Sequence, residues 1–303
     1  MHLDYSALPA SVPVPRPSCS DLVIAPPGTG QGYWAGAPSS VWDGSHVYLA
    51  YRLRRPLGEG RGYAVVVARS ADGGRFETLV SLGKEEFSCE SLERPALVRT
   101  PNGAWRLYVS CATPGTKHWR VEVIEAGNPA QFDARRSQVV LPGDAGTGVK
   151  DPTIRYQDGL WRLWASCHPL EDPDETDQMV TNYATSTDGL DWTWHGTALR
   201  GRPGQWDARG TRVTSVCFAG STIIAAYDGR ASAAENYEEF TGVATGSDPA
   251  ALTPLGSEPL AVSPHQGCGL RYLDILPVAD GRHRLYYEMT RPDGAHELRT
   301  ELR

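Results

Sequence analysis

One pattern of apolar and polar positions recurs five times along the 303-residue chain. In each copy an apolar strand, a two-residue turn and an aromatic-rich second strand follow one another, with the short alternation typical of half-buried strands. The turns fall at Asp43-Gly44, Asn102-Gly103, Asp158-Gly159, Ala219-Gly220 and Asp280-Gly281. Four are Asn-Gly or Asp-Gly, a strong hairpin signal because both residues accept positive φ. The pattern predicts five β-hairpins, 56 to 61 residues apart.

Further apolar runs follow the hairpins and predict two more strands per unit. The third strands are expected at 62–70, 118–126, 181–186, 239–247 and 296–302. The fourth strands are expected at 76–82, 135–142, 193–200 and 259–264. Two third strands end in Ser-x-Asp-Gly-x-x-aromatic, at Ser70 and Ser186, where the Asp caps backbone N–H groups of the turn. Each complete unit therefore has four strands.

Four-stranded units that repeat in this way predict an all-β fold, a five-bladed β-propeller with antiparallel blades. The five units use the whole chain, so residues 1–303 form one domain. The expected blades are 33–82, 90–142, 149–200, 209–262 and 269–303. The last blade lacks a fourth strand, and we expect segment 20–25 to supply it and close the ring, which would cover two exposed sheet edges.

Composition and charge exclude several other classes. The 32 Gly and 23 Pro argue against long helices or a coiled coil. The net charge of −7 argues against nucleic acid as a partner. No apolar run reaches the roughly 18 residues of a membrane span, and the N-terminal stretch does not have the layout of a signal peptide. We therefore expect a cytoplasmic protein without a membrane partner, whose six cysteines are reduced thiols.

Charged residues gather on the first strand of each unit, which lines the axis of a propeller. The acids are Glu93, Asp151 and Asp274. The neighbouring cations are Arg94, Lys150, Arg209, Arg212 and Arg271. Buried charges are costly unless they are paired or used, and cations around carboxylates pull their pKa values apart. The cluster indicates either a ring of salt bridges that stabilises the channel or a functional site, and its density favours the site.

Other candidates stand beside these strands. Trp34 precedes the first inner strand, where it can stack on a sugar ring or pack between blades. His168 follows a second strand and is either a donor to a substrate hydroxyl or a capped loop residue. Asp228 and Arg230 end another second strand, and Glu288 is a further candidate for substrate binding. The acidic run at 171–177 contains Pro and lacks the EF-hand Gly, so a solvated or lid-like loop is favoured over a metal site, and no cofactor is expected.

A family resemblance rests on short motifs in this order and spacing. They are Glu93-Arg94-Pro95, Lys150-Asp151-Pro152, the Ser186 to Trp192 turn, Trp206-Asp207 and Tyr227-Asp228-Gly229-Arg230. With five such units, the chain resembles the five-bladed propeller glycosidases, among them glycoside hydrolase families 43, 32, 62, 68, 117 and 130. One departure is clear: the first inner strand carries Ala37 where family 43 and family 32 proteins have a catalytic Asp.

The resemblance implies cleavage of a glycosidic bond by two carboxyl groups. By position, Glu93 would be the general acid, and Asp151 the base, nucleophile or cation stabiliser, with Asp228 and Asp274 in reserve. The basic residues favour a small glycoside or oligosaccharide that carries an anionic group. The alternatives are a non-hydrolytic enzyme such as an isomerase or lyase, a glycoside phosphorylase, and, least favoured, a sugar-binding module. The sequence makes no prediction about oligomeric state.

Overall fold

The computed structural model describes residues 12–278 and 281–303, so Asp280 of the fifth predicted turn lies outside the described residues. Regular structure in this part of the chain is almost entirely β, and its helical pieces are 3-10 turns of three or four residues. No helix there is both long and apolar enough to span a membrane. The all-β class predicted from the alternating pattern is confirmed.

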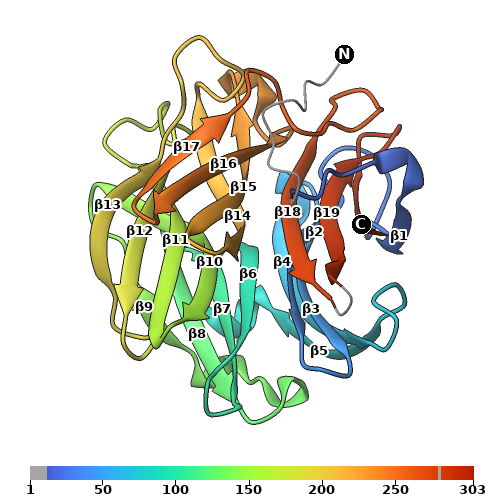
Figure 1. Ribbon diagram of the computed structural model, residues 1–303, viewed down its shortest axis with the longest axis vertical. Coiled ribbons are helices and arrows are strands. Elements are labelled where there is room, and N and C mark those ends of the chain that lie inside the picture. The colour runs from blue at the N-terminus through green and yellow to red at the C-terminus, as the bar shows by residue number, and fades with distance from the viewer. Residues whose placement is uncertain (1–11, 279–280) are drawn as a thin grey trace.

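Most strands pair antiparallel in groups of four that follow the chain (Figure 1). The first group is β2 (Trp34–Trp42), β3 (Val47–Arg54), β4 (Gly62–Ser70) and β5 (Glu77–Gly83). The second is β6 (Leu92–Arg99), β7 (Trp105–Ala112), β8 (Trp119–Ala126) and β9 (Gln138–Leu141). The third is β10 (Thr147–Gln157), β11 (Leu160–Pro169), β12 (Val180–Ser186) and β13 (Thr193–Leu199). The fourth is β14 (Gly210–Ala219), β15 (Thr222–Arg230), β16 (Phe240–Asp248) and β17 (Ala251–Leu255).

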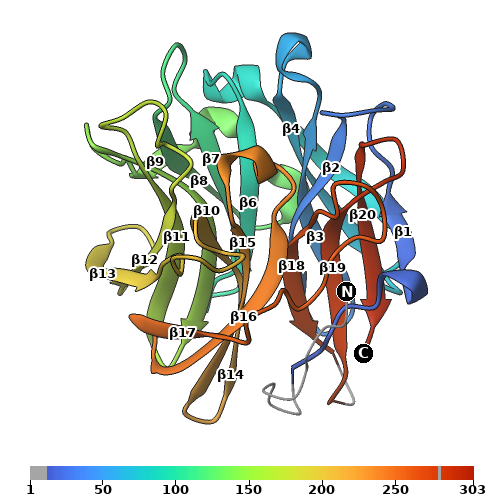
Figure 2. The ribbon, with the colours of Figure 1, turned by 90° about the horizontal axis from the view of Figure 1, so that it is seen from above.

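The two ends of the chain meet in the remaining strands. These strands are β18 (Leu270–Pro277), β19 (His283–Thr290), β20 (His296–Leu302) and β1 (Asp21–Ile24). β1 pairs antiparallel with β20, with Asp21 opposite Thr300 and Leu22 opposite Arg299. Figure 2 shows β1 beside β20 at the edge of the molecule. The N-terminal segment 20–25 thus provides the outer neighbour of the last C-terminal strand.

One predicted strand is misplaced. The fourth strand of the fourth group is Ala251–Leu255 rather than 259–264. Within the latter segment Ala261 makes only an isolated bridge to Thr241. The predicted segment 259–264 was chosen for its apolar run, whereas Ala251–Leu255 pairs with β16 as an edge strand, where Pro254 is tolerated because one side needs no ladder hydrogen bond. The Asp248 turn brings the chain back at once, so the nearer segment pairs first.

The strands β2, β6, β10, β14 and β18 form the inside of the molecule. Each contacts the next one and β18 contacts β2, so the five make a ring. Each also carries an irregularity in register against its own partner, for example between Gly36 and Ser39 and between Arg271 and Asp274. These bulges push backbone and side chains toward the axis. Three equivalent residues there, Ala37, Asp151 and Tyr272, have φ of +54°, +52° and +55°.

Hydrophobic contacts between neighbouring groups fill the space outside this ring. Trp105 of β7 packs on Tyr48 of β3 with ring centroids 4.5 Å apart, and Phe76 meets Tyr286 of β19. Cys111 and Cys167, at equivalent positions of β7 and β11, are buried free thiols in two such clusters. The aromatic excess of the second strands therefore serves packing between groups, and the charged inner strands remain free to shape the axis.

Candidate active site

A cavity of about 370 Å³ opens where the inner strands converge. Within the described residues its lining is strongly basic. Eight cationic side chains line it: Arg52, Arg54, Arg61, Lys117, Lys150, Arg212, Arg230 and Arg271. Three acids line it, Glu93, Asp177 and Glu239, together with the aromatic residues Trp34, Trp119, Tyr237 and Tyr272. Several of these cations also pair with acids that lie behind the lining, namely Asp151, Asp228 and Glu288.

Glu93, on β6, is an ionised carboxylate held by two arginines. Arg52 Nη1 donates to Oε2 at 2.7 Å and Arg54 Nη1 donates to Oε1 at 3.0 Å. Burial acts to raise the pKa of Glu93, but these guanidinium groups and Lys150 outweigh it and lower the pKa to about 2. Only 4% of Glu93 is exposed, and that part faces the cavity. A carboxyl with this pKa carries no proton at neutral pH, whereas the role of general acid expected for Glu93 requires a carboxyl whose pKa is raised.

Two further glutamates fix the arginines that surround the cavity. Glu239 accepts from Arg230 and Arg271 at 2.6 Å each. Glu288, on β19, accepts from Arg271 Nη2 at 2.7 Å and from Arg52 Nη2 at 2.6 Å. Close guanidinium groups hold the pKa of both carboxyls well below the usual range, although burial opposes this. Gly36 leaves room for Glu288, since a Cβ there would lie 2.0 Å from Oε2.

Asp151, fully buried on β10, contacts several of the charged groups around the cavity. Its Oδ2 accepts from Arg212 Nη1 at 3.2 Å and lies 3.7 Å from Lys150 Nζ. Its Oδ1 accepts the Arg94 N–H at 3.2 Å. The Asp151 N–H in turn donates to Ser110 Oγ at 2.9 Å. Asp151 therefore sits behind the cavity wall and positions two of the cations that line it.

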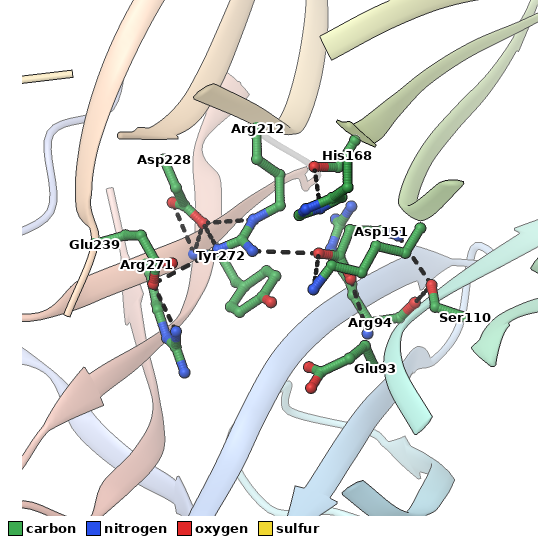
Figure 3. Close-up of polar contacts among 12 residues, drawn as sticks. Glu93, Arg94, Ser110, Asp151, His168, Arg212, Asp228, Glu239, Arg271 and Tyr272 are labelled. Carbon is green, nitrogen blue, oxygen red and sulfur yellow. Dashed lines mark hydrogen bonds and ion pairs between the residues drawn. The ribbon is translucent and has the colours of Figure 1, made fainter. Parts of the chain in front are cut away.

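Asp228, at the end of β15, is the buried acid with a raised pKa. Arg212 donates to Oδ2 at 2.7 Å, and the Tyr272 N–H lies 3.0 Å from each carboxylate oxygen. Complete burial outweighs these donors and raises the pKa of Asp228 to about 6. Figure 3 shows Arg212 between Asp228 and Asp151. Asp228 does not line the cavity, so its proton is separated from a ligand by Arg212.

His168 and Lys150 form a second edge of the site. His168 Nδ1 lies 2.8 Å from the Thr176 carbonyl oxygen, which can only accept, so Nδ1 carries the proton. Nε2 then accepts from Ser166 Oγ at 3.2 Å. Burial and the nearby Lys150 ammonium lower the pKa of His168 to about 3, so the ring is neutral at physiological pH. Lys150 lies over Trp119, with Nζ 4.8 Å from the ring centroid.

Besides Asp151, Asp228 and Glu288, three further predicted site residues lie away from the cavity lining. Arg94 spans the inner strands and donates to the carbonyl oxygens of Pro38, Pro152 and Thr214, so it ties its own group to three others. Asp274 accepts from the Ser40 N–H at 2.7 Å and joins β18 to β2. Arg209 pairs with Asp177 at 2.7 Å in front of β14. The predicted residues that do line the cavity are Trp34, Glu93, Lys150, His168, Arg212, Arg230 and Arg271.

Other residues of the site were not predicted from the sequence. They include Arg52, Arg54, Asp177, Tyr237 and Tyr272. Arg52 and Arg54 stand two apart on β3 and so share one face of the strand, which was a usable signal in an otherwise apolar segment. Asp177 belongs to the acidic run, and it places that loop at the cavity mouth. Within the described residues no group of His, Cys, Asp or Glu has an arrangement suited to a metal ion.

The chain has the all-β propeller fold of glycoside hydrolase-family enzymes. A glycosyl hydrolase from Bacteroides ovatus is 14% identical, with a TM-score of 0.65 over 96% of this chain and 91% of its own. The GH43_1 enzyme from Xanthomonas citri, solved with xylotriose, is 16% identical, with a TM-score of 0.66 over 93% of this chain and 90% of its own.

A third similar structure comes from a report on GH130 mannoside phosphorylases, a family that contains glycoside hydrolases targeting beta-1,2 mannosidic linkages in Candida mannan. It is 16% identical, with a TM-score of 0.65, and the match covers 98% of this chain and 92% of that one. No family model and no curated protein sequence matches the chain. At these identities the similarity establishes the fold alone.

Proposed function

We propose that the protein is a glycosidase-like enzyme that acts on a small glycoside bearing an anionic group, bound in the cavity. The observation that carries this proposal is the cavity itself, where ionised Glu93 faces a space lined by eight cations and several aromatic rings. Arginine and lysine suit carboxylate and phosphate groups, and aromatic faces suit the apolar face of a sugar. The solved structures with this fold include a complex with xylotriose.

The arrangement supports a role for Glu93 different from that of general acid. Its two arginines keep it ionised, so we assign to it attack on, or electrostatic stabilisation of, the cationic anomeric centre that forms as the glycosidic bond breaks. Asp151 acts behind it by holding Lys150 and Arg212 in place. In the same proposal the strand groups are the five blades of one propeller, with β1 as the last outer strand.

A glycoside phosphorylase is the second candidate, because one observation favours it. Ala37 leaves the first inner strand without an acid, and every acid lining the cavity has a lowered pKa or pairs with arginine. In phosphorolysis inorganic phosphate is the attacking group, and the cations of the cavity would bind it without a protein nucleophile. This candidate requires phosphate for turnover, whereas hydrolysis does not.

A screen of aryl glycosides, including furanosides and uronides, tests both candidates. The wild type, Glu93→Gln and Asp151→Asn are compared with and without phosphate, and released phenol is measured. We expect the wild type to cleave a uronide and Glu93→Gln to lose at least about a hundredfold in rate, as for loss of a charge-stabilising group. Strict dependence on phosphate would identify the phosphorylase. Absence of cleavage, with equal sugar affinity in all three proteins, would refute a catalytic role.

A further inference from the structure

Tyr272 has a backbone conformation that a bulky side chain rarely adopts. Its φ is +55°, in the left-handed region, at the bulge of β18 that faces the axis. Asp228 holds this conformation, since both carboxylate oxygens lie 3.0 Å from the Tyr272 N–H. Arg212 lies over the ring with its guanidinium carbon 3.8 Å from the centroid. Strain that the surroundings enforce in this way is characteristic of functional positions.

The hydroxyl of Tyr272 is unusual among the fully buried tyrosines. Tyr108, Tyr227, Tyr286 and Tyr287 each donate a hydrogen bond to a protein oxygen at 2.7 to 2.9 Å. Within the described residues the Tyr272 hydroxyl has no hydrogen-bond partner, and the residue lines the cavity although only 2% of it is exposed. The hydroxyl oxygen is not among the fully buried polar atoms that lack a partner, so it opens onto the cavity and is available to a molecule there.

Lys150 is the second cavity donor that the protein leaves open. Its Nζ lies 3.7 Å from Asp151 Oδ2, beyond hydrogen-bond distance, and its side chain is 14% exposed. The buried guanidinium groups differ, because Arg52, Arg212 and Arg271 are bound to carboxylates at 2.6 to 2.7 Å. They contribute positive potential, and their Nη groups are already engaged, although Arg52 Nε has no partner among the described residues.

Lys150 and Tyr272 are linked through shared neighbours. Asp151 contacts both Lys150 and Arg212, and Arg212 in turn covers the Tyr272 ring. In Figure 3 the Tyr272 ring lies between the Arg212–Asp228 pair and the side that holds Asp151 and Glu93. Burial and these two acids hold the pKa of Tyr272 well above its usual range, so the hydroxyl keeps its proton and acts as a donor.

We propose that the Tyr272 hydroxyl and the Lys150 ammonium directly bind an oxyanion, either a carboxylate of the ligand or inorganic phosphate. The hydroxyl donates one hydrogen bond and the ammonium supplies a charge-assisted one, while the arginine–glutamate network fixes both and supplies potential. No proton is transferred in this step. The inference rests on the proposed function, because it names the contacts that select the anionic group of the substrate.

Calorimetric titration with glucuronate, inorganic phosphate and neutral glucose tests the assignment. Tyr272→Phe removes only the hydroxyl, and Lys150→Met removes only the charge while keeping the stem over Trp119. We expect each variant to weaken oxyanion binding at least about tenfold, the effect of one hydrogen bond to a charged group. Tyr108→Phe is the matched control, because it removes a buried hydroxyl that donates to the Gly189 carbonyl, far from the cavity lining. It should lower stability and leave affinity unchanged.

The anion that binds more tightly identifies the source of the oxyanion. The proposal is overturned if the wild type binds neither anion, or if Tyr272→Phe binds both as the wild type does. Weaker binding in Tyr272→Phe without any measurable glycoside cleavage would support the subsite and refute the proposed function. Glycoside cleavage together with unchanged anion affinity in Tyr272→Phe would support the proposed function and refute the subsite.

Discussion

Gly36 illustrates how a single missing side chain makes room for the charged network. A Cβ at this position would lie 2.0 Å from Glu288 Oε2, which bonds to Arg52. Gly36→Ala should therefore displace the carboxylate and lower the free energy of unfolding by about 1–3 kcal/mol, as overpacking does. Urea unfolding measures the change. Gly58→Ala is the control, since no atom lies within 4 Å of the added Cβ. Equal effects of the two substitutions would contradict the packing role of Gly36.

The lowered pKa of Glu93 implies a specific pH dependence of the free energy of unfolding. Its pKa is about 2 in the fold, against an ordinary 4.5, so the stabilisation it provides is present above about pH 4.5 and is lost as the pH falls toward 2. Glu93→Gln should lower the free energy of unfolding by about 3 kcal/mol at neutral pH, and its difference from the wild type should shrink in acid. Denaturant unfolding at several pH values measures this.

The control for that experiment is Glu77→Gln. Glu77 pairs with Arg69 on the surface, and its side chain is 72% exposed. An exposed pair contributes little, so this variant should follow the wild type across the same pH range. A pH-independent difference between Glu93→Gln and the wild type would show that the ionised carboxylate is not what stabilises the fold there.

At the scale of strands, the sequence was informative where local chemistry decides the structure. Turn residues such as Asp43-Gly44 and the alternation around them predicted the hairpins, and the order of inner strands predicted which cations would converge. The apolar run at 259–264 misled the placement of one outer strand, because an apolar run does not say which segment pairs with the neighbouring strand. The turn and alternation pattern therefore predicted the inner strands of each group better than the outermost strand.

The site residues that the sequence did not predict were missed for a different reason. The role of Tyr272 depends on a group brought from another strand, because its N–H donates to Asp228 of β15. This pairing has no local sequence pattern. The pKa of Glu93 likewise depends on Arg52 and on Arg54 from the neighbouring group, so position in a motif suggested an acid where the fold makes an ionised carboxylate.

The pairing of β1 with β20 makes a testable contribution to the fold. Ser20 is part of this junction, where Arg299 Nε donates to its Oγ at 2.6 Å. A chain beginning at residue 26 would expose the edge of β20, and we expect lower stability and more self-association than in the full chain. Thermal unfolding and light scattering measure both properties.

Leu22→Ser provides the control for the truncation. The Leu22 side chain is 48% exposed and the substitution keeps the backbone ladder to Arg299. This variant should resemble the wild type in both measurements. A truncated chain with wild-type stability and unchanged association would show that β1 is dispensable.

At the scale of the whole molecule, charge is distributed unequally. The chain carries a net charge of −7, yet the cavity lining holds eight cations and three acids among the described residues. The affinity for glucuronate should therefore fall as salt is added, because screening shortens the reach of these charges to about 10 Å at 0.1 M. The neutral methyl ester of glucuronate is the matched control. The same salt dependence for both ligands would contradict an electrostatic contribution from the cavity.

The central claim is that ionised Glu93 and the basic cavity act together on an anionic glycoside. The most direct measurement is the initial rate of phenol release from a para-nitrophenyl uronide and from the matching neutral glycoside, by the wild type and by Glu93→Gln. The account predicts faster cleavage of the uronide by the wild type and loss of that rate in Glu93→Gln. Equal rates for the two glycosides, or a Glu93→Gln variant as active as the wild type, would contradict it.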